Sequence, residues 1–280
     1  MWSLDPPAIT ARHSYDACVG ATKDPGRRRL LLAAGDSVEA ASERFRRAAH
    51  SGTLHELPGT GFTVPGIPAE EAVRWVYGNG MVNTRNGRAI YDQLMAAPAD
   101  ERCPLCGHGV VRTLDHYLPK RMFPALCVDP LNLVPACADC NHAKGESLPV
   151  SAETTLLHPY LDHIDNDPWL TARVVVTNPV WLEFYVSPPP TWGPLLADRT
   201  RHHFELFGLA ELFAVQANRT LNNIRQHLTT VLVAGGRELV RAYLKDEAAT
   251  RLAHRLNGWE GVTYRTFASD DTFCSGAFSL

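Results

Sequence analysis

The sequence predicts an α+β fold, in which a mainly helical chain carries a compact ββα unit in its middle and a β-hairpin after it. Three observations lead to this prediction. Helical apolar spacing occupies both ends of the chain, two C-x-x-C pairs enclose two short strand patterns, and two β-rich runs flank an Asn-Pro turn. We divide the 280 residues accordingly into 1–98, 99–150 and 151–280.

The N-terminal region is predicted to be mostly helical. Residues 37–49 are rich in alanine, Ser37 can cap them, and Gly52 lies just beyond their end. Two further helices are expected over 69–77 and 87–97, and the second leads directly into the first C-x-x-C pair.

The chain changes character after the second C-x-x-C pair. Residues 172–186 contain the runs VVVT and WLEFYV, which predict a β-hairpin, and the prolines at 188–190 end it. From residue 198 to about 256 the pattern is helical again, with apolar side chains at helical spacing, namely Leu206, Leu209, Leu212 and Phe213.

The composition describes a folded chain without membrane segments. Hydrophobic residues make up 45% and charged residues 20%, which allows a buried core. There is no run of about 18 apolar residues and no signal-peptide pattern, so we expect a cytoplasmic protein with no membrane partner. The net charge of −3 means that any surface for nucleic acid must be a local basic patch.

The cysteines indicate a metal. Disulfides are rare in the cytoplasm, so two C-x-x-C pairs favour structural zinc held by four thiolates, with buried free thiols as the alternative. The four paired cysteines are Cys103, Cys106, Cys137 and Cys140, whereas Cys18, Cys127 and Cys274 stand alone.

The segment between the two pairs is long enough for a small fold. Thirty residues separate Cys106 from Cys137, more than the roughly 15 to 20 of an ordinary zinc ribbon. We expect strands over 110–115 and 131–135, then a short helix over 139–145. One zinc ion would therefore staple both ends of a ββα unit.

Polar residues at the ends of these elements suggest a second metal site. Asp115 and His116 end the first strand, and Asn141 follows the last cysteine on the first turn of the helix. A carboxylate and an amide oxygen make a sparse site for a hard cation such as Mg²⁺, with room for phosphate oxygens. His116, whose side chain leaves the strand on the other side from Asp115, can accept a proton from water as a general base.

The segment resembles the signature of the HNH (ββα-metal) endonucleases in their four-cysteine form. Three motifs carry the resemblance, in this order: Asp-His, Asn-Leu and C-x-x-C-Asn-x-x-Lys. The resemblance covers residues 103–145 and departs from the literal H-N-H pattern at Asn141, which replaces histidine. It implies that His116 activates the attacking water and that Asp115 and Asn141 hold a catalytic Mg²⁺ or Mn²⁺. It also implies that Asn132 braces the loop between the strands and that the four cysteines hold structural zinc.

Three cations lie within the same segment. Lys120, Arg121 and Lys144 are expected to meet the phosphates of a nucleic acid. The alternative for them is an ordinary solvated surface, because Asp129 and Asp139 nearly balance their charge.

The function that follows is metal-dependent hydrolysis of phosphodiester bonds, with DNA as the favoured substrate. Two alternatives remain open. One is a non-catalytic, zinc-dependent module that binds nucleic acid or protein. The other is a defence or toxin-like effector that cuts only with a partner such as an ATPase or sensor. The near-neutral charge favours this alternative, because a nuclease with weak intrinsic affinity for DNA is harmless until it is recruited.

Overall fold

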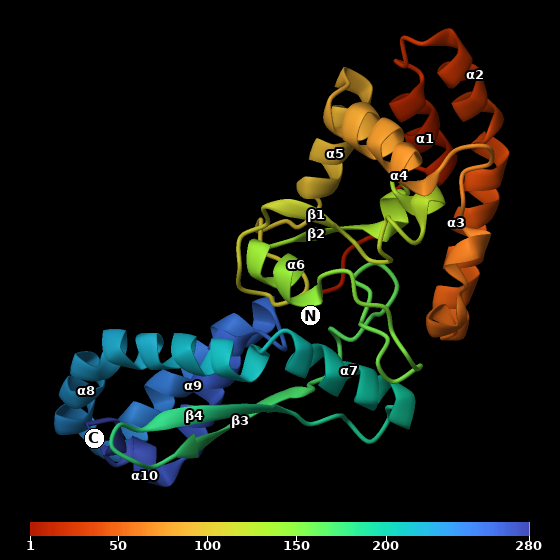
Figure 1. Cartoon of the computed structure of the whole chain (residues 1–280). Helices are drawn as coiled ribbons and strands as arrows, with labels where there is room; N and C mark the ends of the chain where they lie inside the picture. Colours follow the sequence, from red (N-terminus) through yellow and green to blue (C-terminus); the bar gives the residue numbers. More distant parts are fainter. Residues whose placement is uncertain (280) are drawn as a thin grey trace. The chain divides into compact units, whose positions relative to one another are not determined.

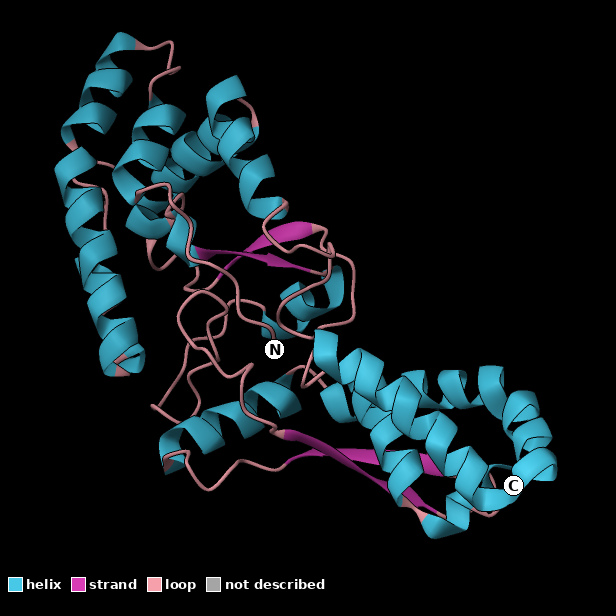
Figure 2. Cartoon of the chain, turned by 180° about the vertical axis from the view of Figure 1, so that it is seen from behind, coloured by secondary structure: helices cyan, strands magenta, loops and turns pink. Residues whose placement is uncertain are grey.

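The computed structural model describes residues 1–279, and its contacts divide the chain into two compact units, Met1–His163 and Ile164–Leu280. The described residues are mainly helical and contain two antiparallel two-stranded sheets, as predicted (Figures 1 and 2). Both predicted boundaries, at 98 and 150, fall inside the first unit. Among residues 1–279, no helix is both long and apolar enough to cross a membrane.

Four regular helices dominate the first part of the first unit. They are α1 (Ala11–Val19), α2 (Pro25–Ala33), α3 (Gly35–Ser51) and α5 (Arg85–Met95). The helices predicted over 37–49 and 87–97 are confirmed as α3 and α5. The periodicity does not reveal α1 and α2, which are only nine residues long, although Thr10 and Asp24 cap them through their side chains.

The helix predicted over 69–77 is largely a π-helix. α4 (Ala69–Ala72) continues directly into the π-helical segment η3 (Val73–Val82). The packing of α5 against η3 explains the need for glycine here: a Cβ atom on Gly87 would lie 2.3 Å from the carbonyl oxygen of Gly80. This close approach ties η3 to α5.

The centre of the first unit is the expected ββα arrangement. β1 (Thr113–His116) pairs antiparallel with β2 (Leu133–Ala136), so that Asp115 lies opposite Val134, and α6 (Ala138–Lys144) follows at once. The order of strand, strand and helix is therefore confirmed.

The strands are shorter than predicted and begin later. The first was expected over 110–115 and the second over 131–135. Pro130 opens a single 3₁₀ turn, η5 (Pro130–Asn132), and the Asp129 side chain caps it, so β2 cannot begin before Leu133.

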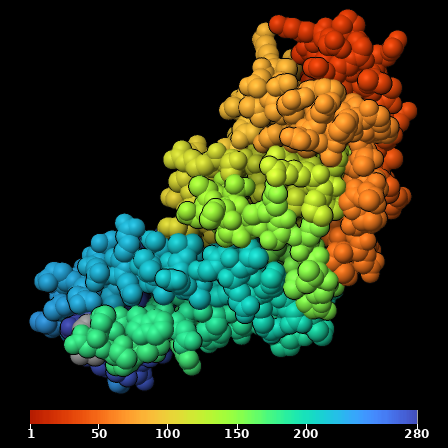
Figure 3. All heavy atoms as spheres, in the orientation of Figure 1, coloured from red at the N-terminus to blue at the C-terminus, as the bar shows by residue number. Residues whose placement is uncertain are grey.

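Aromatic contacts join the helices of the first unit to its ββα part. Phe62 packs edge-on against Phe123, with ring centroids 5.1 Å apart, and Phe45 of α3 lies 6.3 Å from Tyr117. In Figure 3 the helices (red to orange) and the central segment (yellow to green) form a continuous packed surface. The ββα elements therefore share a core with the N-terminal helices.

The second unit combines a hairpin with long helices. The predicted hairpin is confirmed, and so is the helical character of 198–256. The hairpin consists of β3 (Leu170–Val175) and β4 (Trp181–Val186), and the helices are α7 (Pro194–Leu206), α8 (Leu209–His254), α9 (Trp259–Ser269) and α10 (Asp271–Cys274). α8 bends at Gly236, where φ is 71°, a conformation that favours glycine.

Candidate metal centre and active site

Each C-x-x-C pair is a turn in which a backbone amide faces a sulfur atom. In the first, the amide of Gly109 donates to Cys106 Sγ at 3.3 Å. In the second, Cys137 is the N-cap residue of α6, and its Sγ accepts from the amide of Cys140 at 3.4 Å. Hydrogen bonds of this kind favour the thiolate form, which is the form that binds metals.

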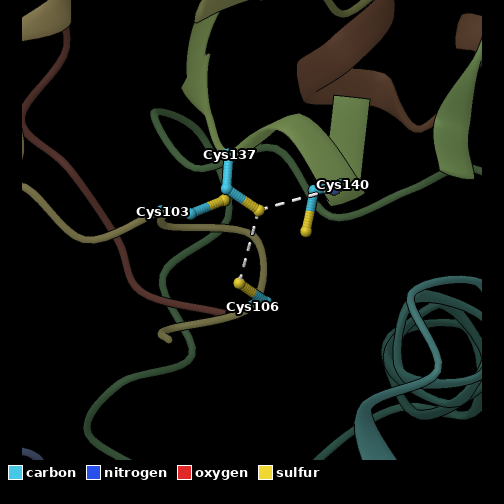
Figure 4. A group of neighbouring side chains, drawn as sticks. All are labelled: Cys103, Cys106, Cys137 and Cys140. Atoms are coloured by element: carbon cyan, nitrogen blue, oxygen red, sulfur yellow. Dashed lines mark hydrogen bonds between the residues drawn. The ribbon is translucent and has the colours of Figure 1, made fainter. Parts of the chain in front are cut away.

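The four cysteines gather at one point (Figure 4). All four are buried, and their sulfur atoms lie within 4.8 Å of one another. Cys106 Sγ and Cys137 Sγ are 3.9 Å apart. Metal–sulfur bonds of about 2.3 Å in a tetrahedral shell place sulfur atoms about 3.8 Å apart. The cluster therefore fits a four-coordinate metal such as zinc.

Hydrogen bonds among the thiols move their pKa values in opposite directions. Bonds from neighbouring thiols lower the pKa of Cys106 and Cys137, and such bonds raise the pKa of Cys103 and Cys140. Four adjacent thiolates repel one another unless a cation offsets their charge. A divalent metal ion stabilises all four thiolates together, so the donor set fits zinc in its chemistry as well as in its spacing.

His116, at the end of β1, is buried and held by the main chain. Its Nε2 lies 2.9 Å from the carbonyl oxygen of Cys127. A carbonyl only accepts, so Nε2 carries the proton and Nδ1 keeps a lone pair. Burial lowers the pKa of His116 to about 3, and the ring is therefore neutral at pH 7.

Asp115 lies on the face of β1 that meets α6, where Lys144 contacts it. Lys144 Nζ is 3.2 Å from Asp115 Oδ2 and also donates to the carbonyl oxygen of His116 at 2.7 Å. The side chains of Lys144 and Asp115 are 4% and 7% exposed. Burial raises the pKa of Asp115, and the ammonium of Lys144 opposes that rise. α6 is thus attached to β1 at the two candidate catalytic residues.

This geometry corrects the expectation for Lys144. The sequence suggested a surface cation that meets phosphates, but the register of α6 against β1 directs Lys144 inward. Asn141 lies one turn earlier, on the same side of α6, and is half-buried. From this spacing we expect the Asn141 side chain to lie near the side of α6 that faces Asp115.

The other two predicted cations remain accessible. Lys120 is half-buried, and its Nζ lies 5.7 Å from the centre of the Tyr77 ring. Arg121 is exposed and 3.6 Å from a carboxylate oxygen of Glu146. An exposed pair of this kind is weak, so Arg121 can exchange its partner for another anion.

Asn132 makes the contacts that a loop brace requires. It is fully buried, and its Oδ1 accepts from the amide of Leu118 at 2.7 Å. Its Nδ2 donates to the carbonyl oxygens of Leu118 at 3.0 Å and Leu126 at 3.2 Å. One side chain thus satisfies three backbone groups of the segment between β1 and β2.

Two residues outside the signature complete the surroundings of His116. Tyr77 of η3 lies edge-on to the imidazole, with ring centroids 4.6 Å apart, and Cys127 supplies the carbonyl described above. The sequence gives no signal for either. The contact from Cys127 is made by its backbone carbonyl, which every residue type has. Tyr77 lies in a π-helical segment, whose turns do not produce the apolar spacing of an α-helix.

The chain is similar to a known protein of a bacteriophage. Protein ea31 of Escherichia phage lambda is 29% identical over 238 residues, which cover 79% of each chain. No protein-family model matches the chain, and no solved structure matches it. The likeness to the phage protein extends well beyond the cysteine-rich segment.

The thiol cluster should make folding depend on zinc. We predict about one zinc ion per chain, and Cys137→Ser should lose both the ion and the cooperative unfolding of the first unit, because metal binding contributes to the folding free energy. Elemental analysis and thermal unfolding measure the two effects. Cys274→Ala, a buried cysteine of the second unit, should retain the zinc. Folded, zinc-free wild-type protein would contradict the assignment.

Asn132→Ala should destabilise the first unit. The substitution leaves three buried backbone groups without a partner, so the free energy of unfolding should fall by at least about 2 kcal/mol. Chemical denaturation measures the loss. The control is Asn86→Ala, at an exposed position of α5, which should change stability by no more than about 0.5 kcal/mol. Equal stability of the two variants would exclude the bracing role.

Proposed function

We propose that this protein is a metal-dependent endonuclease of the HNH type that hydrolyses phosphodiester bonds in the cytoplasm, with DNA as its favoured substrate. The observation that carries the proposal is the neutral His116, whose Nε2 is fixed by the Cys127 carbonyl within a ββα unit. A ring held through one nitrogen presents the other in a defined direction, as a general base requires.

The proton transfer falls to His116 alone. Nδ1 accepts the proton of the attacking water, and the Cys127 carbonyl keeps the ring oriented while it becomes charged. With a pKa near 3, His116 is a weak base in the free protein. A phosphodiester beside the ring adds negative charge that stabilises the imidazolium, which raises the pKa toward the working pH.

Asp115 and Asn141 are the residues that would hold Mg²⁺ or Mn²⁺. A cation bound there supplies charge that stabilises the phosphate and the leaving oxygen. Lys144 Nζ is 3.2 and 3.4 Å from the two oxygens of Asp115, longer than the roughly 2.7 to 2.9 Å of a strong charged hydrogen bond. Asp115 therefore keeps acceptor capacity for a second cation.

Lys120 and Arg121 would contact the substrate backbone. Besides burial, the charge of Lys120 contributes to the low pKa of His116, so this cation is close to the candidate base. Contacts to phosphate position a strand without reading its sequence. Cleavage should accordingly show little sequence preference and should weaken as salt increases.

One observation favours a non-catalytic, zinc-dependent binding module as the second candidate. Asp115 and His116 are each only 6% exposed, and Asp115 is already paired with Lys144. In this alternative the pair and Asn132 serve only to hold the ββα unit together, and the exposed cations bind nucleic acid or protein without cleaving it.

His116→Ala should reduce plasmid nicking in the presence of Mg²⁺ by at least about 100-fold, because the general base is lost. His142→Ala is the matched control: it changes an exposed histidine of α6 next to Asn141 and should leave the rate unchanged. Zinc content should match the wild type in both variants. Because His116 is buried and hydrogen-bonded, His116→Ala should melt at a lower temperature, so the rates are compared at a temperature at which both variants are folded. Cleavage by His116→Ala at the wild-type rate would contradict the catalytic assignment, and DNA binding by a wild-type protein that never cleaves would establish the binding module.

A further inference from the structure

Tyr77 lies close to three residues of the candidate active site. Its ring is edge-on to His116, with ring centroids 4.6 Å apart, and Lys120 Nζ lies 5.7 Å from the ring centre. Its hydroxyl is also near enough to Asp115 for the charge of that carboxylate to act on it. A phosphate that meets His116, Lys120 and a cation at Asp115 therefore lies beside Tyr77.

The segment that carries Tyr77 is packed on two sides. The approach of Gly87 ties η3 to α5, and Gly80 lies equally close to α1, where a Cβ atom on it would be 2.7 Å from the carbonyl oxygen of Cys18. The π-helical turns of η3 also set the direction in which Tyr77 leaves the helix, and such turns are rare and recur at functional sites. The place of the ring next to His116 is thus fixed before a substrate arrives.

The Tyr77 hydroxyl is available as a donor. The side chain is half-buried, and its hydroxyl makes no hydrogen bond within residues 1–279. Burial raises the pKa of Tyr77 above its ordinary value, so the phenol stays protonated near neutral pH. A protonated phenol can donate one hydrogen bond to an anion.

A neutral donor suits this position better than a further cation. When water attacks a phosphodiester, negative charge builds up on the non-bridging oxygens, and a positioned donor stabilises that charge most in the transition state. The charge of Lys120 contributes to the low pKa of His116. The phenol of Tyr77 adds a hydrogen bond without positive charge, so it does not weaken the candidate base further.

We propose that the Tyr77 hydroxyl donates a hydrogen bond to a non-bridging oxygen of the scissile phosphate, and that Tyr77 is therefore a catalytic residue. The proposal rests on the proposed nuclease function and deepens it. The N-terminal helical part of the first unit then supplies a group that the ββα unit lacks, and the site is complete only when η3 is packed against it.

Tyr77→Phe removes the hydroxyl and keeps the ring beside His116. In the presence of Mg²⁺, kcat for DNA cleavage should fall at least about 10-fold, whereas KM, zinc content and melting temperature should stay close to the wild-type values. Tyr91→Phe is the matched control. It removes the hydroxyl of a half-buried tyrosine of α5 whose ring contacts Arg88, and it should cleave at the wild-type rate.

Sulfur in the substrate tests whether the hydroxyl touches the phosphate. A sulfur atom in place of a non-bridging oxygen accepts hydrogen bonds poorly, so phosphorothioate DNA should be cleaved more slowly than ordinary DNA by the wild type. The slowing should be at least about 3-fold smaller in Tyr77→Phe, because this variant has no hydroxyl to lose its acceptor. Packing of the ring against His116 alone would not produce such a coupling.

Three results would each overturn the proposal: cleavage by Tyr77→Phe at the wild-type rate, an equal loss in Tyr91→Phe, or the same slowing by sulfur in Tyr77→Phe and the wild type. Any of these, found together with an inactive His116→Ala, would remove the role of Tyr77 and leave the nuclease assignment intact. Wild-type protein that does not cleave DNA would overturn both.

Discussion

The four clustered thiols are the constraint on which the centre of the first unit depends. β1 and β2 have four residues each and α6 has seven, and elements of this length are unstable alone in water. Cys103 and Cys106 precede β1, whereas Cys137 and Cys140 lie at the start of α6. A metal ion bound to all four would close the loop at both ends and hold the short strands in register, while aromatic contacts supply the surrounding core.

Two buried polar side chains extend this constraint to the candidate catalytic residues. Asn132 fixes the segment after β1 through three backbone groups, and Lys144 connects α6 to Asp115 and to the carbonyl of His116. A buried ion pair adds little net stability, although the loss of one partner is costly. Its effect here is therefore mainly positional. The N-terminal helices contribute as well, since the Tyr77 ring packs against His116 from η3.

The sequence alone predicts those features that depend on local patterns. Cysteine spacing indicates the thiol cluster, β-rich runs on both sides of an Asn-Pro turn indicate the hairpin, and apolar residues three and four positions apart indicate the long C-terminal helices. It does not predict the inward direction of Lys144, because that depends on how α6 is rotated against β1. The contact of Tyr77 with His116 joins segments far apart in the chain, and it cannot be predicted from the side-chain chemistry of either residue.

The most direct test of the proposed nuclease mechanism removes the catalytic cation while the structural zinc stays bound. Zinc held by four thiolates has no open position for a phosphate, so the proposed hydrolysis would need a second, weakly bound cation at Asp115 and Asn141. Plasmid cleavage is measured in EDTA under conditions in which elemental analysis shows that the zinc is retained. We predict that cleavage stops in EDTA, returns with millimolar Mg²⁺ or Mn²⁺, and does not return in Asp115→Ala. Full cleavage in EDTA with zinc retained and no added cation would contradict it.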